Sequence, residues 1–147
     1  LVVGGRGSGS AALHEKAVKA GLTNTLFCDE IDPDEIPGLY AQCSAGLVAL
    51  DARHKTHNIP GKFISYMHSG LPVLASINPG NDLADLVKDA GVGRVSVQPQ
   101  GSDLPDLAFD MLDNELRDDE IKYRCTALAK RLFSAEAAAN QILRHLV

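Results

Sequence analysis

Basic side chains gather in one polar stretch, residues 51–62, that lies between two apolar runs. Three of these side chains are cationic: Arg53, Lys55 and Lys62. Pro60 predicts a helix over about residues 61–69, because the first turn of a helix has unpaired N–H groups and tolerates proline. Cations beside such a helix N-terminus bind anions, so the stretch predicts a diphosphate site. A solvated surface loop is the alternative interpretation of the same residues.

The histidines of this stretch raise the question of a metal site. His54 and His57 follow Asp51 at spacings of three residues, and both side chains can ligate metals. The neighbouring Arg and Lys side chains repel a cation, so we expect no metal ion here. We expect His57 to hydrogen-bond the hydroxyl groups of a ligand instead.

A glycine-rich turn, residues 4–12, follows the first apolar run and precedes a helical pattern. Three of its residues fit the dinucleotide-binding spacing G-x-G-x-x-A: Gly7, Gly9 and Ala12. Asp29 lies where an acid would hold a ribose. Because such turns also serve plain strand-to-helix geometry, we expect secondary ligand contacts here, through Gly5, Arg6 and Asp29. The alternative is an NAD(P)-binding oxidoreductase domain that uses the same glycines, Ala12 and Asp29.

A third polar loop, residues 76–82, contains small and amide side chains and also follows an apolar run. Asn78 and Gly80 are candidates to close on the same ligand, and Asn81 or Asp82 suits the start of the next helix. A plain turn with an N-cap is the alternative. Ligands bind at the carboxyl ends of parallel strands, so loops that follow strands are the expected place for a site.

The elements that must position these loops are short apolar runs alternating with helical patterns. Two of these patterns have apolar residues at helical spacing: Ile36, Leu39, Tyr40 and Cys43 in one, and Leu83, Leu86, Val87 and Ala90 in the other. The apolar runs are residues 1–3, 25–28, 45–50, 72–75 and 94–97. Apolar strands separated by amphipathic helices indicate a parallel sheet covered on both faces. We therefore predict an α/β fold, a Rossmann-like three-layer sandwich with a parallel sheet of about five strands. Beyond Pro99 the strands stop, and three helical patterns predict a helical C-terminal tail that packs on the sheet.

Length and composition limit the possible functions. The 147 residues suffice for one domain, residues 1–147, and a net charge of −5 argues against a nucleic-acid partner. The longest wholly apolar run, residues 45–50, is too short for a membrane span. Three cysteines without a C-x-x-C pair indicate a reducing, cytoplasmic location. The chain begins with Leu1, which suggests a fragment of a longer protein.

Residues 58–76, NIPGKFISYMHSGLPVLAS, resemble the retaining two-domain nucleotide-sugar glycosyltransferases of the B-type fold, the glycosyl transferases of group 1. Residues 1–5, 25–29 and 35–44 resemble further segments of the donor-binding, carboxyl-terminal half of that family. The PGKF and NPGNDL segments look like transferases that add deoxy-amino sugars such as N-acetylfucosamine in lipopolysaccharide assembly.

The resemblance implies a metal-independent enzyme that transfers a sugar from a UDP-sugar donor. The segment that would bind the diphosphate through backbone N–H groups consists of Asn58, Ile59, Pro60 and Gly61. Members of the family carry two glutamates, whose positions correspond here to His57, which would face the sugar, and Ser65, which would lie at the ribose. We expect His57 and Lys62 to be catalytic.

The same resemblance implies an upstream half of the protein that binds a glycan or lipid-linked acceptor. We expect that half to lie outside the present chain. The fragment alone would then be inactive, and the full-length protein would work at the inner face of the membrane. A non-catalytic regulatory domain is the remaining alternative, and it rests on fold analogy alone.

Overall fold

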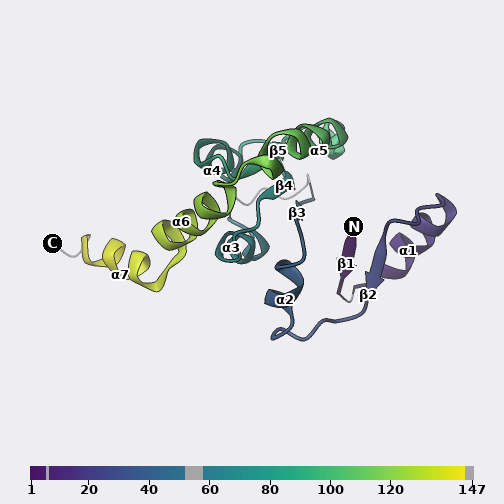
Figure 1. The fold of residues 1–147 in the computed structure, drawn as a ribbon, viewed down its shortest axis with the longest axis horizontal. Helices are drawn as coiled ribbons and strands as arrows, with labels where there is room; N and C mark the ends of the chain where they lie inside the picture. Colours follow the sequence, from purple (N-terminus) through teal and green to yellow (C-terminus); the bar gives the residue numbers. More distant parts are fainter. Residues whose placement is uncertain (6, 52–57, 145–147) are drawn as a thin grey trace. The chain divides into compact units, whose positions relative to one another are not determined.

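A computed structural model describes residues 1–5, 7–51 and 58–144 of the chain (Figure 1). These residues fall into two compact units, Leu1–Leu39 and Tyr40–Val147, called the first and second unit below. Strands and helices alternate, and the described strand pairs are all parallel, so the predicted α/β class is confirmed. The five strands pair in two sheets, of two and three strands, where one sheet of about five was expected.

The elements follow the predicted order, and each strand boundary lies within one residue of the predicted apolar run. The first unit contains β1 (Val2–Gly4), α1 (Ser10–Lys19) and β2 (Leu26–Cys28), and α2 (Ile36–Tyr40) spans the boundary between the units. The second unit contains β3 (Gly46–Ala49), α3 (Gly61–His68), β4 (Val73–Ser76), α4 (Leu83–Ala90), β5 (Gly93–Ser96), η1 (Pro99–Gly101), α5 (Leu104–Asp113), η2 (Glu115–Arg117), α6 (Ile121–Phe133) and α7 (Ala135–Arg144).

The first unit is a parallel β1–β2 pair joined by α1. Val2 lies opposite Leu26, and the His14 ring of α1 stacks on Phe27 at a centroid distance of 4.7 Å. Ala17 is the one buried residue among its described positions. Two strands and a helix bury too little apolar surface to be stable alone. The hydrophobic core lies in the second unit.

The second unit is a three-layer sandwich around the sheet β3-β4-β5. In β4, Val73 and Ala75 point to one face and Leu74 and Ser76 to the other, since side chains alternate along a strand. The first face packs into the hydrophobic core built from α3, α4 and α6. Helix α5 contacts β4 and β5 from the second face, and Figure 1 shows it on the opposite side of the strands from α3 and α4.

Ion pairs attach α5 to the sheet. Arg94 of β5 is the register partner of Leu74 and so belongs to the face that α5 covers. Its Nε lies 2.8 Å from Asp110 Oδ2, without the alignment of a hydrogen bond, and its Nη2 lies 2.9 Å from Glu115 Oε1. Both ends of the α5–η2 segment are thereby held to β5, because Asp103 at the start of α5 contacts the Ser96 hydroxyl.

The helices beyond Pro99 pack in three different ways, whereas all were expected to cover the sheet. Only α5 covers a sheet face directly; α6 lies against α3 and α4, and α7 contacts α6. Arg124 of α6 donates from Nε to the Gly91 carbonyl at 2.9 Å, at the C-terminal end of α4. The reason for the difference is space, because α3 and α4 already line that face of the sheet. None of the described helices is both long and apolar enough to span a bilayer.

Candidate functional site

The N-terminus of α3 lies at the carboxyl edge of the second unit's sheet. In a β3–α3–β4 crossover the helix runs against the strands, so it begins at the edge where β3 ends. Tyr66 positions this helix: its hydroxyl donates to the Leu47 carbonyl of β3 at 3.3 Å, and its ring fills the space beside Gly46. Burial, reinforced by Tyr40 and Cys43, raises the pKa of Tyr66, so the hydroxyl remains a donor.

The first turn of α3 leaves backbone donors exposed. Pro60 is the N-cap, in extended backbone, and its carbonyl accepts from the N–H groups of Phe63 at 3.0 Å and Ile64 at 3.4 Å. The N–H groups of Gly61 and Lys62 precede these bonds, and no described side chain caps them. Unpaired N–H groups at a helix start can bind an anion, so the geometry predicted from Pro60 and Gly61 is present.

The charge of this first turn is unusual for a helix. It contains no acidic residue, and its charged side chain is the exposed Lys62. A cation at a helix N-terminus opposes the helix dipole, which favours negative charge there. A bound anion would turn this repulsion into an attraction for both the dipole and the lysine.

The other predicted residues around α3 lie in different environments. Asn58 is exposed, whereas Ile59 is half-buried against the core. Ser65, expected at the ribose, is exposed one turn into α3, and its hydroxyl donates to the Gly61 carbonyl at 3.1 Å. Its oxygen can still accept a hydrogen bond from a ligand hydroxyl.

The loop after β4 is organised by two buried amides. Asn78 is 4% and Asn81 2% exposed, and Asn81 Nδ2 donates to Asn78 Oδ1 at 3.3 Å. Asn81 Oδ1 accepts from the Leu83 N–H at 3.0 Å, whereas Asp82 occupies the N-cap position of α4 and makes no capping hydrogen bond with its side chain. Gly80 is exposed with φ 78°, a conformation that favours glycine. The loop is therefore a preformed polar corner at the same sheet edge as the start of α3.

A second polar corner follows β5, and the sequence analysis missed it. Ser96 is fully buried; its hydroxyl donates to Asp103 and accepts from the Gln98 N–H at 3.3 Å. Gly101, with φ 63°, lies so close that a Cβ there would be 2.9 Å from Ser76 Oγ. The available signal was a serine near the carboxyl end of the fifth apolar run; Ser96 is the last residue of β5, as Ser76 is of β4.

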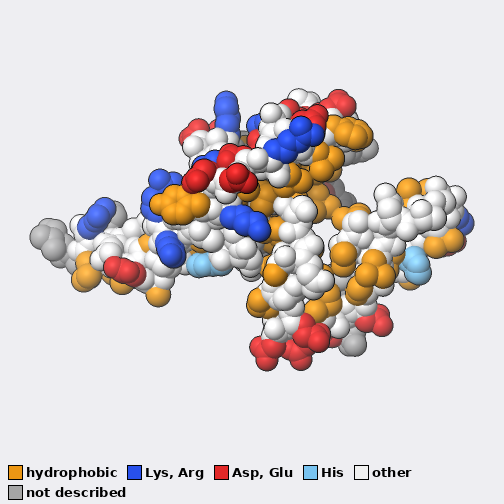
Figure 2. All heavy atoms as spheres, in the orientation of Figure 1, with side chains coloured by type: hydrophobic (Ala, Val, Ile, Leu, Met, Phe, Trp, Pro, Cys, Tyr) orange, Lys and Arg blue, Asp and Glu red, His pale blue; other side chains and the backbone are white. Residues whose placement is uncertain are grey.

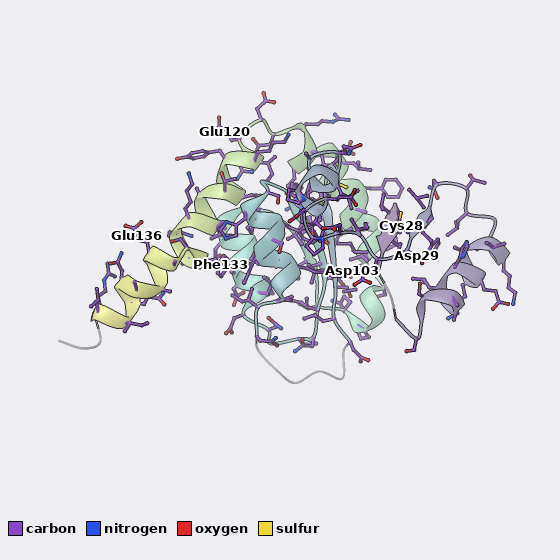
Figure 3. All side chains as sticks on the ribbon, turned by 90° about the horizontal axis from the view of Figure 1, so that it is seen from below. Cys28, Asp29, Asp103, Glu120, Phe133 and Glu136 are labelled. Atoms are coloured by element: carbon purple, nitrogen blue, oxygen red, sulfur yellow. The ribbon has the colours of Figure 1, made fainter. Side chains whose placement is uncertain are left out.

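The glycine-rich turn of the first unit shows which of its glycines the fold requires. Gly5 has φ 127°, and its N–H donates to the Cys28 carbonyl at 3.3 Å, so it extends the β1–β2 pairing. Gly7 and Gly9 have no left-handed φ, and a Cβ at either would meet nothing within 4 Å among the described atoms. Turn geometry thus accounts for Gly5, while the other two leave the backbone open to a ligand. Asp29 follows β2 directly and is exposed (Figure 3).

Several predicted residues fall outside the described part of the chain. They are Arg6, Arg53, His54, Lys55 and His57. The described candidate site of the second unit therefore consists of the α3 start with Lys62 and the amide corner after β4, and the turn before α1 is a separate candidate in the first unit. Among the described residues, no group of three or more His, Cys, Asp or Glu side chains is placed to hold a metal ion.

The amino-acid sequence was also compared with known proteins. No family model matches the chain, and no curated protein matches it.

Proposed function

We propose that this chain binds a nucleoside-diphosphate sugar and supplies the donor site of a glycosyltransferase that builds lipopolysaccharide or another surface polysaccharide. The observation that carries the proposal is the start of α3, where uncapped N–H groups and Lys62 meet without an acidic side chain. A diphosphate is the ligand that satisfies both the donors and the charge.

The proposed chemistry is stabilisation of a leaving group. When the bond between the sugar's anomeric carbon and the diphosphate oxygen breaks, negative charge builds on the diphosphate. The N–H groups of Gly61 and Lys62, together with the lysine ammonium, face that charge from fixed positions, so little reorganisation is needed. Gly80 and the amide corner of Asn78 and Asn81, at the same sheet edge, would contact the sugar.

The remaining parts of this proposal concern the acceptor and the location. The resemblance to retaining glycosyltransferases favours a UDP-sugar donor and a glycan or lipid-linked acceptor. It also favours a site of action on the cytoplasmic side of the membrane.

A dinucleotide is the second candidate ligand. It is favoured by Gly7 and Gly9, which the fold does not require, and by Asp29 at the end of β2. Glycines at these positions allow a pyrophosphate to approach the backbone, and the acid would hold a ribose. This site would lie in the first unit.

A ligand panel followed by thermal unfolding tests both candidates. We expect UDP and UDP-sugars at about 100 times their dissociation constant to stabilise the protein by ~2.7 kcal/mol, a shift of roughly 5–10 °C. Uridine is the matched control, since it lacks the diphosphate and should give no shift. A shift with NAD or NADP alone would replace the first candidate by the second, and no shift with any of these ligands would reject both.

A further inference from the structure

Charge is distributed very unevenly along this chain. Residues 1–120 contain nine Lys and Arg against eighteen Asp and Glu, whereas residues 121–147 contain five against one. The five cations are Lys122, Arg124, Lys130, Arg131 and Arg144, and the acid is Glu136. Helices α6 and α7 therefore form a cationic segment on a protein whose net charge is −5.

Most of this positive charge faces solvent. Arg124 has a structural role, because it bonds the Gly91 carbonyl and pairs with Asp118 Oδ2 at 2.6 Å. The other four cations are exposed. They are thus accessible to a negatively charged surface.

Helix α7 also presents an apolar stripe that no other described segment of the second unit covers. Its apolar residues recur at helical spacing: Ala135, Ala138, Ala139, Ile142 and Leu143. All five are exposed, Ile142 by 62% and Leu143 by 59%, and α7 contacts α6 rather than the core. Figure 1 shows α7 extending beyond α6, and Figure 2 shows hydrophobic side chains along the lower edge of α7, with an acidic side chain among them and basic side chains toward the upper edge.

We propose that α7 docks on an anionic lipid surface, with Ile142 and Leu143 entering the boundary between headgroups and acyl chains. Helices that lie in this boundary combine an apolar stripe with cations on the polar side; here α7 contributes Arg144, and the last turn of α6 contributes Lys130 and Arg131. Lys130, Arg131 and Arg144 have side chains long enough to reach lipid phosphates while the stripe is buried. The charge favours lipid over an ordinary protein partner, because an anionic leaflet attracts each nearby cation without a matched geometry. This docking is independent of the proposed nucleotide-sugar site.

Vesicle co-sedimentation of the whole chain tests the proposal. We expect binding to vesicles of phosphatidylcholine and phosphatidylglycerol, weakening as salt is raised, and none to phosphatidylcholine alone. Exchanging both Ile142 and Leu143 for Asn should weaken binding by about tenfold or more. Lys130→Gln and Arg131→Gln should each weaken it about fivefold.

Two matched variants control for general surface effects. Leu112→Asn removes a leucine of α5 that is 53% exposed, and Lys88→Gln removes an exposed cation of α4. Neither should change vesicle binding. Because the substituted positions on α7 are exposed, the variants should fold normally, which circular dichroism can check. The two charge variants test the same docking without altering the apolar stripe.

Three results would overturn the proposal. The first is no binding of the natural chain to the anionic vesicles. The second is an equal loss of binding in Leu112→Asn and in the double exchange of Ile142 and Leu143. The third concerns the double exchange on α7: vesicle binding stays unchanged, while light scattering shows a lower molar mass than for the natural chain. That result would show that the stripe binds a protein partner instead.

Discussion

Replacing Lys62 by alanine should weaken ligand binding while slightly stabilising the fold. Lys62 is the second residue of α3, exposed, in a first turn that has no acid and no described side-chain cap. Without a ligand its charge opposes the positive end of the helix dipole, at a cost of ~0.3–1 kcal/mol. Lys62→Ala should therefore raise the free energy of unfolding by up to about 1 kcal/mol, and alanine's helix propensity acts in the same direction.

The effect on diphosphate binding has the opposite sign. A charge-assisted hydrogen bond contributes ~1.5–3 kcal/mol. Its loss should lower the affinity for UDP by roughly one to two decades. The backbone N–H groups remain, so weak binding should persist. A stability gain combined with an affinity loss distinguishes this lysine from one that only packs.

Lys88→Ala is the matched control for both the change in stability and the change in UDP affinity. Lys88 is exposed in the last turn of α4, where a cation is favourable to the helix dipole. Its removal should lower the free energy of unfolding by ~0.3–1 kcal/mol and leave UDP affinity unchanged.

Calorimetric titration with UDP and urea unfolding of all three proteins measure these quantities. Equal UDP affinity in the natural chain and in Lys62→Ala would show that this lysine is a solvated surface residue and that the anion site at α3 is wrong. A loss of stability in Lys62→Ala would refute the dipole argument itself.

Three further predictions concern the packing that positions the site. Gly46→Ala should lower the free energy of unfolding by ~1–3 kcal/mol, since the new Cβ would overlap the Tyr66 ring; urea unfolding should show a smaller cost in a Tyr66→Leu background, and equal costs would contradict the contact. Burial raises the pKa of Cys125 to about 11, so iodoacetamide at about pH 8 should label the other two cysteines first, as peptide mass mapping can check. The hydrogen bond from Arg124 lowers the pKa of Asp118, so this pair stabilises the fold above the carboxyl's unfolded pKa and is lost as pH falls through the lowered folded value; Arg124→Gln should raise the Asp118 pKa in an NMR titration, and an unchanged value would refute this cause.

Local spacing was sufficient to predict most elements and the start of the candidate site. The apolar residues Leu83, Leu86, Val87 and Ala90 predicted α4, because a helix in this position must bury one stripe. Pro60 predicted where α3 begins, because its missing N–H costs nothing in a first turn. These signals depend only on residues close in the sequence, so they can be interpreted without knowing which segments pack against them.

Local spacing failed where local chemistry and tertiary contacts disagreed with the pattern. Ile36, Leu39, Tyr40 and Cys43 have helical spacing, yet α2 ends at Tyr40 after five residues. Gly38 lies in the middle of that helix and weakens it, which the apolar pattern does not register.

The pairing of strands and the partners of buried polar groups were decided by the tertiary structure alone. An apolar run shows that a strand is buried, but its hydrogen-bonding neighbour is a segment far away in the chain; thus five predicted strands divide into a pair and a triplet. Asp103 occupies the N-cap position of α5, yet its carboxylate accepts a hydrogen bond from the buried Ser96 hydroxyl instead of capping the helix.

The exposure of α7 shows the same division between sequence and fold. The sequence by itself determines that Ile142 and Leu143 share one apolar stripe, because 3.6 residues make a turn whatever the surroundings. Only the packing of α6 on α3 and α4, with α7 carried past them, decides that this stripe meets no core. Burial is a property of what lies across from a residue, and that is determined by long-range packing.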